Sequence, residues 1–84
     1  MPHVVIYTKS WCGYCTRAKA LLARKGVKFW EIEISDDEAL RDEMVARAGG
    51  RRTVPQIFIG ETHVGGCDDL YLLESEGRLD AFLA

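Results

Sequence analysis

Strand-like and helix-like segments alternate from the third residue of this chain, and this alternation constrains the fold more than any other feature. His3–Thr8 is a short run of apolar and β-branched residues, which is typical of a strand buried on both faces. Cys12–Lys25 has its apolar residues on one helical face, and Gly26 is placed to end that helix. Val27–Ile34 then alternates with strand periodicity. This order predicts a right-handed βαβ unit with two parallel strands.

The middle of the chain predicts a second helix and a hairpin. Ser35-Asp-Asp-Glu38 has the pattern of a capping box, in which we expect Ser35 to start the helix. Gln56–Ile59 and Thr62–Val64 are strand-like, and the short connection between them predicts a tight turn. We therefore expect the hairpin to add two strands to the same sheet.

The end of the chain predicts a third helix and completes the architecture. Asp68 and Asp69 form a good N-cap pair for a helix that runs to about Glu76, and Leu79–Leu83 predicts a short last turn or helix. The order is β-α-β-α-β-β-α, and one sheet with helices on both faces packs it economically. We predict a single α/β domain over residues 1–84, with a four-stranded mixed sheet and three main helices.

Charge and cysteine content exclude several classes of protein. The formal net charge is −2, which gives no general reason to expect nucleic acid or an anionic membrane as a partner. Three cysteines are an odd number, which argues against a secreted disulfide framework. The apolar runs are too short for a signal peptide or a membrane span. We therefore expect a cytoplasmic protein. We also expect it to be a monomer.

A Cys-x-x-Cys motif lies between the first strand and the first helix. Cys12 is at the helix N-terminus, where unpaired amides and the helix dipole stabilise a thiolate, and Lys9 can add positive charge. Cys15 lies one turn deeper in the helix. This asymmetry makes Cys12 the attacking sulfur and Cys15 the resolving one, so the motif predicts a redox pair.

Three separated motifs make the chain resemble the glutaredoxins, specifically the small bacterial dithiol type within the thioredoxin-like superfamily. The resemblance covers essentially the whole chain in order and without large gaps. It implies a thioredoxin-like fold and a glutathione-dependent thiol–disulfide oxidoreductase that reduces protein–glutathione mixed disulfides and some protein disulfides. The motifs are Tyr7-Thr-Lys9 with Cys12-Gly-Tyr-Cys15, then Thr53-Val-Pro55, then Gly65-Gly-Cys-Asp-Asp69.

The resemblance also implies how the two ends of glutathione bind. The γ-glutamyl end would meet Asp68 and the backbone amides around Cys67, because a helix N-terminus binds a carboxylate and a carboxylate binds an ammonium. The glycyl carboxylate at the opposite end would meet Lys9, together with Arg51 or Arg52. Asp68 could also be only a helix cap, and the two arginines could be solvated loop charges.

The middle of glutathione would lie against Pro55, which matches the family's cis-proline, and against the backbone of Val54. The local sequence alone would favour an ordinary trans proline at the start of an edge strand. Tyr14 would flank and shield the bound sulfur, and Cys67 would be a third thiol outside the exchange pair. The expected glutathione-binding residues are Lys9, Tyr14, Arg51, Thr53, Val54, Pro55, Gly66, Cys67 and Asp68.

Two metal-binding alternatives remain open from the sequence. Cys12, Cys15, His63 and Cys67 form a Cys₃His set that could hold a structural zinc ion, although the two halves of the set lie far apart in the chain. Gly13 stands where many dithiol glutaredoxins carry proline. Members of the family with a small residue there can hold a [2Fe–2S] cluster between two subunits, which would make Cys12 a cluster ligand beside glutathione.

Overall fold

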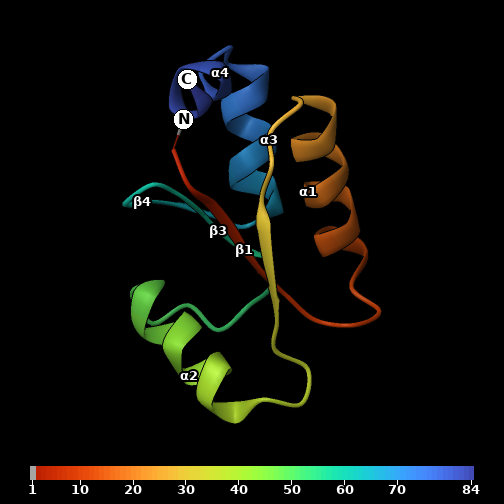
Figure 1. The fold of residues 1–84 in the computed structure, drawn as a ribbon, viewed down its shortest axis with the longest axis vertical. Coiled ribbons are helices and arrows are strands. Elements are labelled where there is room, and N and C mark those ends of the chain that lie inside the picture. The colour runs from red at the N-terminus through yellow and green to blue at the C-terminus, as the bar shows by residue number, and fades with distance from the viewer. Residues whose placement is uncertain (1) are drawn as a thin grey trace.

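A four-stranded mixed sheet in the order β2-β1-β3-β4 organises the computed structural model, which describes residues 2–84. β1 lies at the centre, parallel to β2 and antiparallel to β3, and β3 pairs antiparallel with β4. Helix α2 covers one face of the sheet, and α1, α3 and α4 cover the other (Figure 1). The elements are β1 (Val4–Thr8), α1 (Gly13–Arg24), β2 (Trp30–Glu33), α2 (Glu38–Arg47), β3 (Gln56–Ile59), β4 (Thr62–Gly65), α3 (Cys67–Ser75) and α4 (Leu79–Leu83).

Two apolar cores lie on the two faces of the sheet because successive β1 side chains point in opposite directions. Val4 and Ile6 pack against α1, α3 and α4, whereas Val5 and Tyr7 pack against α2. Every residue of β1 is buried, as the apolar run predicts. The centre of the sheet therefore anchors the turn that follows Thr8, where the Cys-x-x-Cys motif begins.

The second strand is shorter than the sequence predicts. Val27–Ile34 has strand periodicity throughout, but only Trp30–Glu33 pairs with β1. The partner strand runs only over Val4–Thr8, so the earlier residues have little to pair with. Val27 donates its backbone N–H to the Leu22 carbonyl at 3.4 Å and completes the end of α1 instead.

Two helix starts also differ from the prediction. Asp37, not Ser35, caps α2, and its Oδ1 accepts the Leu40 N–H at 2.9 Å. Ser35 Oγ instead accepts the Ser10 N–H at 2.8 Å and ties the β2–α2 loop to the loop after β1. At α3 the N-cap is Gly66, so the aspartates predicted as caps lie inside the first turn.

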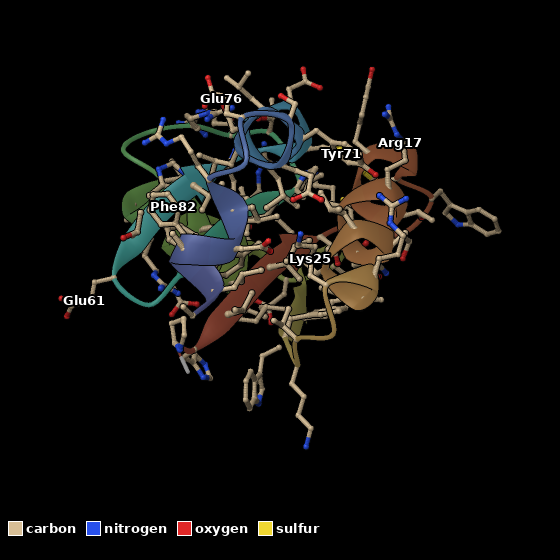
Figure 2. All side chains as sticks on the ribbon, turned by 90° about the horizontal axis from the view of Figure 1, so that it is seen from above. Arg17, Lys25, Glu61, Tyr71, Glu76 and Phe82 are labelled. Atoms are coloured by element: carbon tan, nitrogen blue, oxygen red, sulfur yellow. The ribbon has the colours of Figure 1, made fainter. Side chains whose placement is uncertain are left out.

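Ionic and aromatic contacts join the helices that share one face of the sheet (Figure 2). Lys25 Nζ lies 2.9 Å from Glu74 Oε1 and 2.7 Å from Asp80 Oδ1, which links the end of α1 to α3 and α4. The Tyr71 hydroxyl donates to the Arg17 carbonyl at 3.2 Å, and the Arg17 guanidinium lies over the Tyr71 ring. Within residues 2–84, no helix has the length and apolar character needed to cross a membrane.

Candidate active site around Cys12

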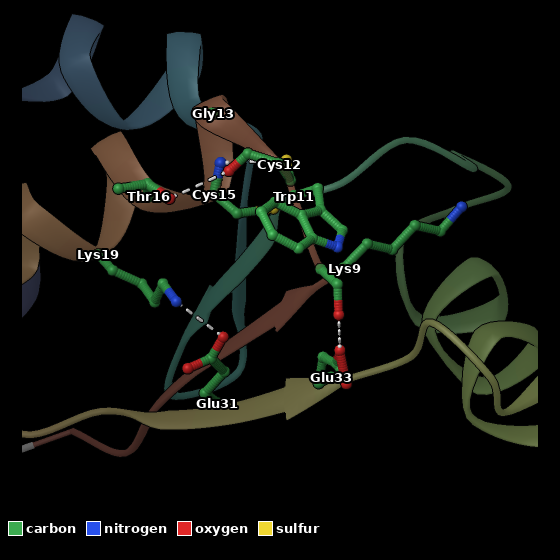
Figure 3. Close-up of a pocket in the computed structure, with 10 residues that line it drawn as sticks. Lys9, Trp11, Cys12, Gly13, Cys15, Thr16, Lys19, Glu31 and Glu33 are labelled. Atoms are coloured by element: carbon green, nitrogen blue, oxygen red, sulfur yellow. Dashed lines mark hydrogen bonds and ion pairs between the residues drawn. The ribbon is translucent and has the colours of Figure 1, made fainter.

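Cys12 is the N-cap of α1, at the corner where the chain turns from the central strand into the helix. Its backbone is extended, and its Sγ accepts the Cys15 N–H at 3.2 Å. Sulfur is a weak acceptor, and it gains from the partial positive charge of a helix N-terminus when it carries negative charge. The preceding residue, Trp11, has a φ of 59° and projects fully into solvent beside the motif (Figure 3).

The two cysteines of the motif differ in exposure as the sequence predicts. Cys12 is half-buried, whereas Cys15 is buried beneath it. Burial, followed by the hydrogen bond with Cys12, raises the pKa of Cys15 to about 12. Cys15 is therefore a protonated thiol near neutral pH. Burial also raises the pKa of the third thiol, Cys67.

A groove of about 300 Å³ adjoins the corner and brings together three separate segments of the chain. They are the first turn of α1, the loop before β3 and the first turn of α3. The Val54–Pro55 peptide bond is cis, as the resemblance implies, and the Val54 carbonyl lies 4.0 Å from Cys12 Sγ. The lining residues are Tyr14, Arg51, Thr53, Val54, Pro55, Gly66, Cys67, Asp68 and Asp69, which include every expected glutathione-binding residue except Lys9.

The α3 end of the groove depends on two glycines and one carboxylate. Gly65 has a φ of 116°, and a Cβ there would collide with the Asp69 carboxylate and the Arg51 guanidinium. Asp69 Oδ2 accepts the Gly66 N–H at 2.8 Å, and this hydrogen bond, with Arg51, holds the pKa of Asp69 below its usual range. From the sequence, Asp69 was predicted only as one of two helix-capping aspartates. Its hydrogen bond to Gly66 is typical of a residue three positions after an N-cap, so the Gly66–Asp69 spacing is the sequence feature that indicates it.

Arg51 lines the groove but does not share it with Lys9. Either Arg51 or Arg52 was expected to join Lys9 at the glycyl end of glutathione; the Arg51 guanidinium pairs with Asp69 at 3.2 Å, at the α3 end of the groove. Arg52 is exposed and does not line the groove. A long, flexible side chain on a loop pairs with the nearest carboxylate in the folded protein. The sequence gives no signal that Asp69 is the carboxylate nearest to Arg51.

Lys9 lies in two other hollows near the corner. One, of about 340 Å³, also contains Arg41 of α2, a basic residue that lies in none of the three sequence motifs. The other, of about 680 Å³, contains Cys12 and Trp11 and is walled by Glu31 and Glu33 of β2 (Figure 3). Hydrogen bonds from Thr8 to Glu31, and from Ser10 and Ser35 to Glu33, lower the pKa of both carboxyls, so they are ionised near neutral pH.

The Cys₃His set considered as a zinc site is not assembled in this fold. Over the described range 2–84, no group of three or more His, Cys, Asp or Glu side chains is arranged to hold a metal ion. His63 instead lies on β4, where its Nε2 is 2.7 Å from Gln56 Oε1.

Comparisons with known proteins agree with these motifs over the whole fold. The family model described as Glutaredoxin matches residues 4–64. The glutaredoxin of Pseudomonas aeruginosa is 63% identical over 84 residues, covering 100% of this chain and 99% of the relative. Glutaredoxin 3 of Escherichia coli K12 is 58% identical over 83 residues, covering 99% of each.

Solved structures give the same result for the fold. The solution structure of Brucella melitensis glutaredoxin matches with a TM-score of 0.87 and 63% identity, covering 99% of this chain and 89% of that one. A buckwheat glutaredoxin–glutathione complex matches with a TM-score of 0.87 and 34% identity, covering 98% and 76%. The fold is the thioredoxin-like fold that the motifs implied, and the chain belongs to the glutaredoxin family, whose members are thiol–disulfide oxidoreductases.

Proposed function

We propose that this protein reduces protein–glutathione mixed disulfides, and some protein disulfides, with glutathione as the reductant. The observation that carries the proposal is the groove beside Cys12, because eight of the nine residues expected to bind glutathione line it. The chemistry of the groove supports a ligand with an amino-acid end and a backbone that can pair with a strand. The related buckwheat protein was solved as a complex with glutathione.

The proposed binding mode uses both ends of the tripeptide. The γ-glutamyl carboxylate meets the free amides at the start of α3, and its ammonium meets Asp68. The backbone of Val54 pairs with the cysteinyl residue, which directs the glutathione sulfur toward Cys12. The glycyl carboxylate meets Lys9 in the hollow that Lys9 shares with Arg41.

The proposed reaction starts when the Cys12 thiolate attacks the glutathione sulfur of a mixed disulfide. The new bond joins Cys12 Sγ to glutathione, and the protein leaves as a thiolate that takes up a proton. A second glutathione, as a thiolate, then attacks the bound glutathione sulfur, which regenerates the Cys12 thiolate and releases glutathione disulfide. In total, one free glutathione is consumed for each mixed disulfide: the target protein is released as a thiol, the two glutathione moieties leave as glutathione disulfide, and Cys12 returns to its starting state.

A second route uses Cys15 for protein disulfides. Here Cys12 first forms a mixed disulfide with the target protein, and Cys15 then attacks Cys12 Sγ to release the reduced target. Because the pKa of Cys15 is raised to about 12, this step needs Cys15 to lose its proton during the attack. Two glutathione molecules then reduce the Cys12–Cys15 disulfide.

Turnover with glutathione, glutathione reductase and NADPH on a glutathionylated protein tests the proposal. We expect saturable activity in the wild type and in Cys15→Ser, because deglutathionylation needs only Cys12. Activity that is independent of glutathione concentration, or full activity in Cys12→Ser, would contradict it.

Cluster binding is a second candidate function. Gly13 is the first residue of α1, and a Cβ there would lie in open space, clear of every part of the protein other than its neighbours in the chain and the backbone of its own helix, so the surface beside Gly13 is open. Such a site would use Cys12 from each of two chains and two glutathione thiolates to hold a [2Fe–2S] cluster. A glutaredoxin C1 from Populus tremula x tremuloides, 35% identical, has been solved in a holo form.

Anaerobic reconstitution with iron, sulfide and glutathione tests this second function. Visible absorption and solution mass should report a coloured dimer, and Gly13→Pro should lose it. A colourless monomer for both proteins would leave the reductase alone.

A further inference from the structure

Gln56 is a fully buried polar side chain that the proposed reaction does not use. It is the first residue of β3 and follows the groove-lining segment Thr53–Pro55 directly. Its Nε2 lies 3.0 Å from the Thr53 carbonyl oxygen and 3.2 Å from Thr53 Oγ1. Burial of an amide costs free energy unless its hydrogen bonds are satisfied, so these contacts define where Thr53 can lie.

The hydrogen bonds fix the orientation of the Gln56 amide. The Thr53 carbonyl can only accept, so the nitrogen of the amide must face it. The amide oxygen then faces His63 Nε2 at 2.7 Å, and His63 must donate from that nitrogen. The three residues form one chain of donors and acceptors from β4, through β3, to the edge of the groove.

His63 is itself held in place by its neighbours. Its ring stacks on Phe58, the residue opposite it on β3, with 4.8 Å between ring centroids. Burial and the charge of Arg51 lower the pKa of His63, against the opposing charge of Asp69. The ring is therefore a neutral donor near neutral pH, and it cannot move without losing the stack.

We propose that Gln56, oriented by His63, is a positioning residue that holds Thr53 and Val54 in the conformation that binds glutathione. The inference rests on the proposed glutathione dependence. Residues 52–55 lie outside every helix and strand, so they need side-chain contacts to keep one conformation. This chain of His63, Gln56 and Thr53 contacts the groove at Thr53 and makes no direct contact with Cys12 Sγ, so its loss should change the affinity for glutathione more than the reactivity of Cys12.

Gln56→Met tests the inference, because methionine keeps the length and burial of the side chain but removes the amide. We expect the KM for glutathione to rise about 5- to 10-fold, which is the loss expected for one to two hydrogen bonds. We expect kcat at saturating glutathione and the rate of Cys12 alkylation to stay within about 2-fold of the wild type, since no atom of Gln56 or His63 contacts Cys12. A smaller rise in KM is expected for His63→Phe, which keeps an aromatic stack on Phe58 but removes the donor.

Ile59→Val is the matched control, because Ile59 lies on the same strand, packs into the core under α1, α3 and α4, and does not line the groove, so the substitution destabilises the fold without changing the groove. It should lower the melting temperature and leave KM unchanged. If Gln56→Met does not fold, Thr53→Val removes the contact between Gln56 Nε2 and Thr53 Oγ1, keeps the contact to the Thr53 carbonyl, and should raise KM by a smaller factor. An unchanged KM in the folded Gln56 or Thr53 variant, or a KM rise in Ile59→Val of the same size, overturns the inference. A wild type that does not use glutathione overturns the proposed function instead.

Discussion

The corner that carries Cys12 and the groove beside it are built in opposite ways. The corner is contiguous, since the strand end, the cysteine pair and the first helical turn follow each other within residues 4–24. The groove is assembled from the start of α1, the loop before β3 and the start of α3. Substitutions in the two regions should therefore have different effects. Those in the corner should abolish the thiol–disulfide reaction, and those in the groove should weaken the binding of glutathione.

The largest effect is expected at the corner, from Cys12→Ser. Serine cannot form a disulfide, so both proposed routes lose their first step and turnover should fall to background. The fold should survive, because the Oγ of serine can still accept the Cys15 N–H at the N-cap. Turnover and thermal unfolding, measured side by side, check this. Retained activity would move the nucleophile to another thiol.

Gly65→Ala should have the next largest effect, because it damages the groove directly. The positive φ at Gly65 disfavours any side chain, and a Cβ would push Asp69 and Arg51 apart. We expect a loss of about 2 kcal/mol or more in the free energy of unfolding and a raised KM for glutathione.

Gly13→Ala is the matched control for Gly65→Ala, because its Cβ meets only open space at a helical position. Its stability should change by less than about 1 kcal/mol. Equal losses for the two variants would mean that the close packing around Gly65 does not matter.

These expectations show which parts of the molecule the sequence could reveal. The cysteine pair, its place after a buried strand and its difference in exposure depend on neighbouring residues, so local patterns predict them. The length of β2 depends on how far β1 runs, which is not visible in the local pattern of Val27–Ile34.

The groove was predicted from the family resemblance. The residues whose contacts were not foreseen share one physical reason. The resemblance implied that Arg51 or Arg52 joins Lys9 at the glycyl carboxylate, but the fold pairs Arg51 with Asp69. Gln56 looked like an ordinary strand residue because its partners, Thr53 and His63, come from a loop and from another strand. Side chains that act through partners elsewhere in the chain need the structure to identify them.

Asp68→Ala should have a moderate effect confined to binding. Removing the proposed charge-assisted contact with the glutathione ammonium should raise KM about tenfold at low salt. The effect should shrink as salt is added, because Asp68 is exposed. Asp42→Ala, an exposed carboxylate of α2, serves as the control. A lower melting temperature with unchanged KM would leave Asp68 with only a helix-stabilising role.

The smallest effect near neutral pH concerns Cys15. Its pKa is raised to about 12 in the folded protein from about 9, so the folded state holds the proton more tightly than the unfolded state. This contribution to stability is complete below pH 9 and is lost as pH rises toward 12. Cys15→Ser should therefore show a shallower loss of stability over this range than the wild type. Urea unfolding at several pH values measures the difference, and parallel curves would show that burial does not perturb Cys15.

The division between a reacting corner and a binding groove is tested most directly with glutathione attached at Cys12 in the Cys15→Ser variant. Amide NMR spectra before and after glutathionylation show which residues the tripeptide touches. Shifts at Thr53, Val54 and the amides of Gly66–Asp68 are predicted, with smaller changes on the β2 side of Cys12. Shifts confined to the hollow lined by Trp11, Glu31 and Glu33 would contradict the account, because they would place glutathione outside the groove.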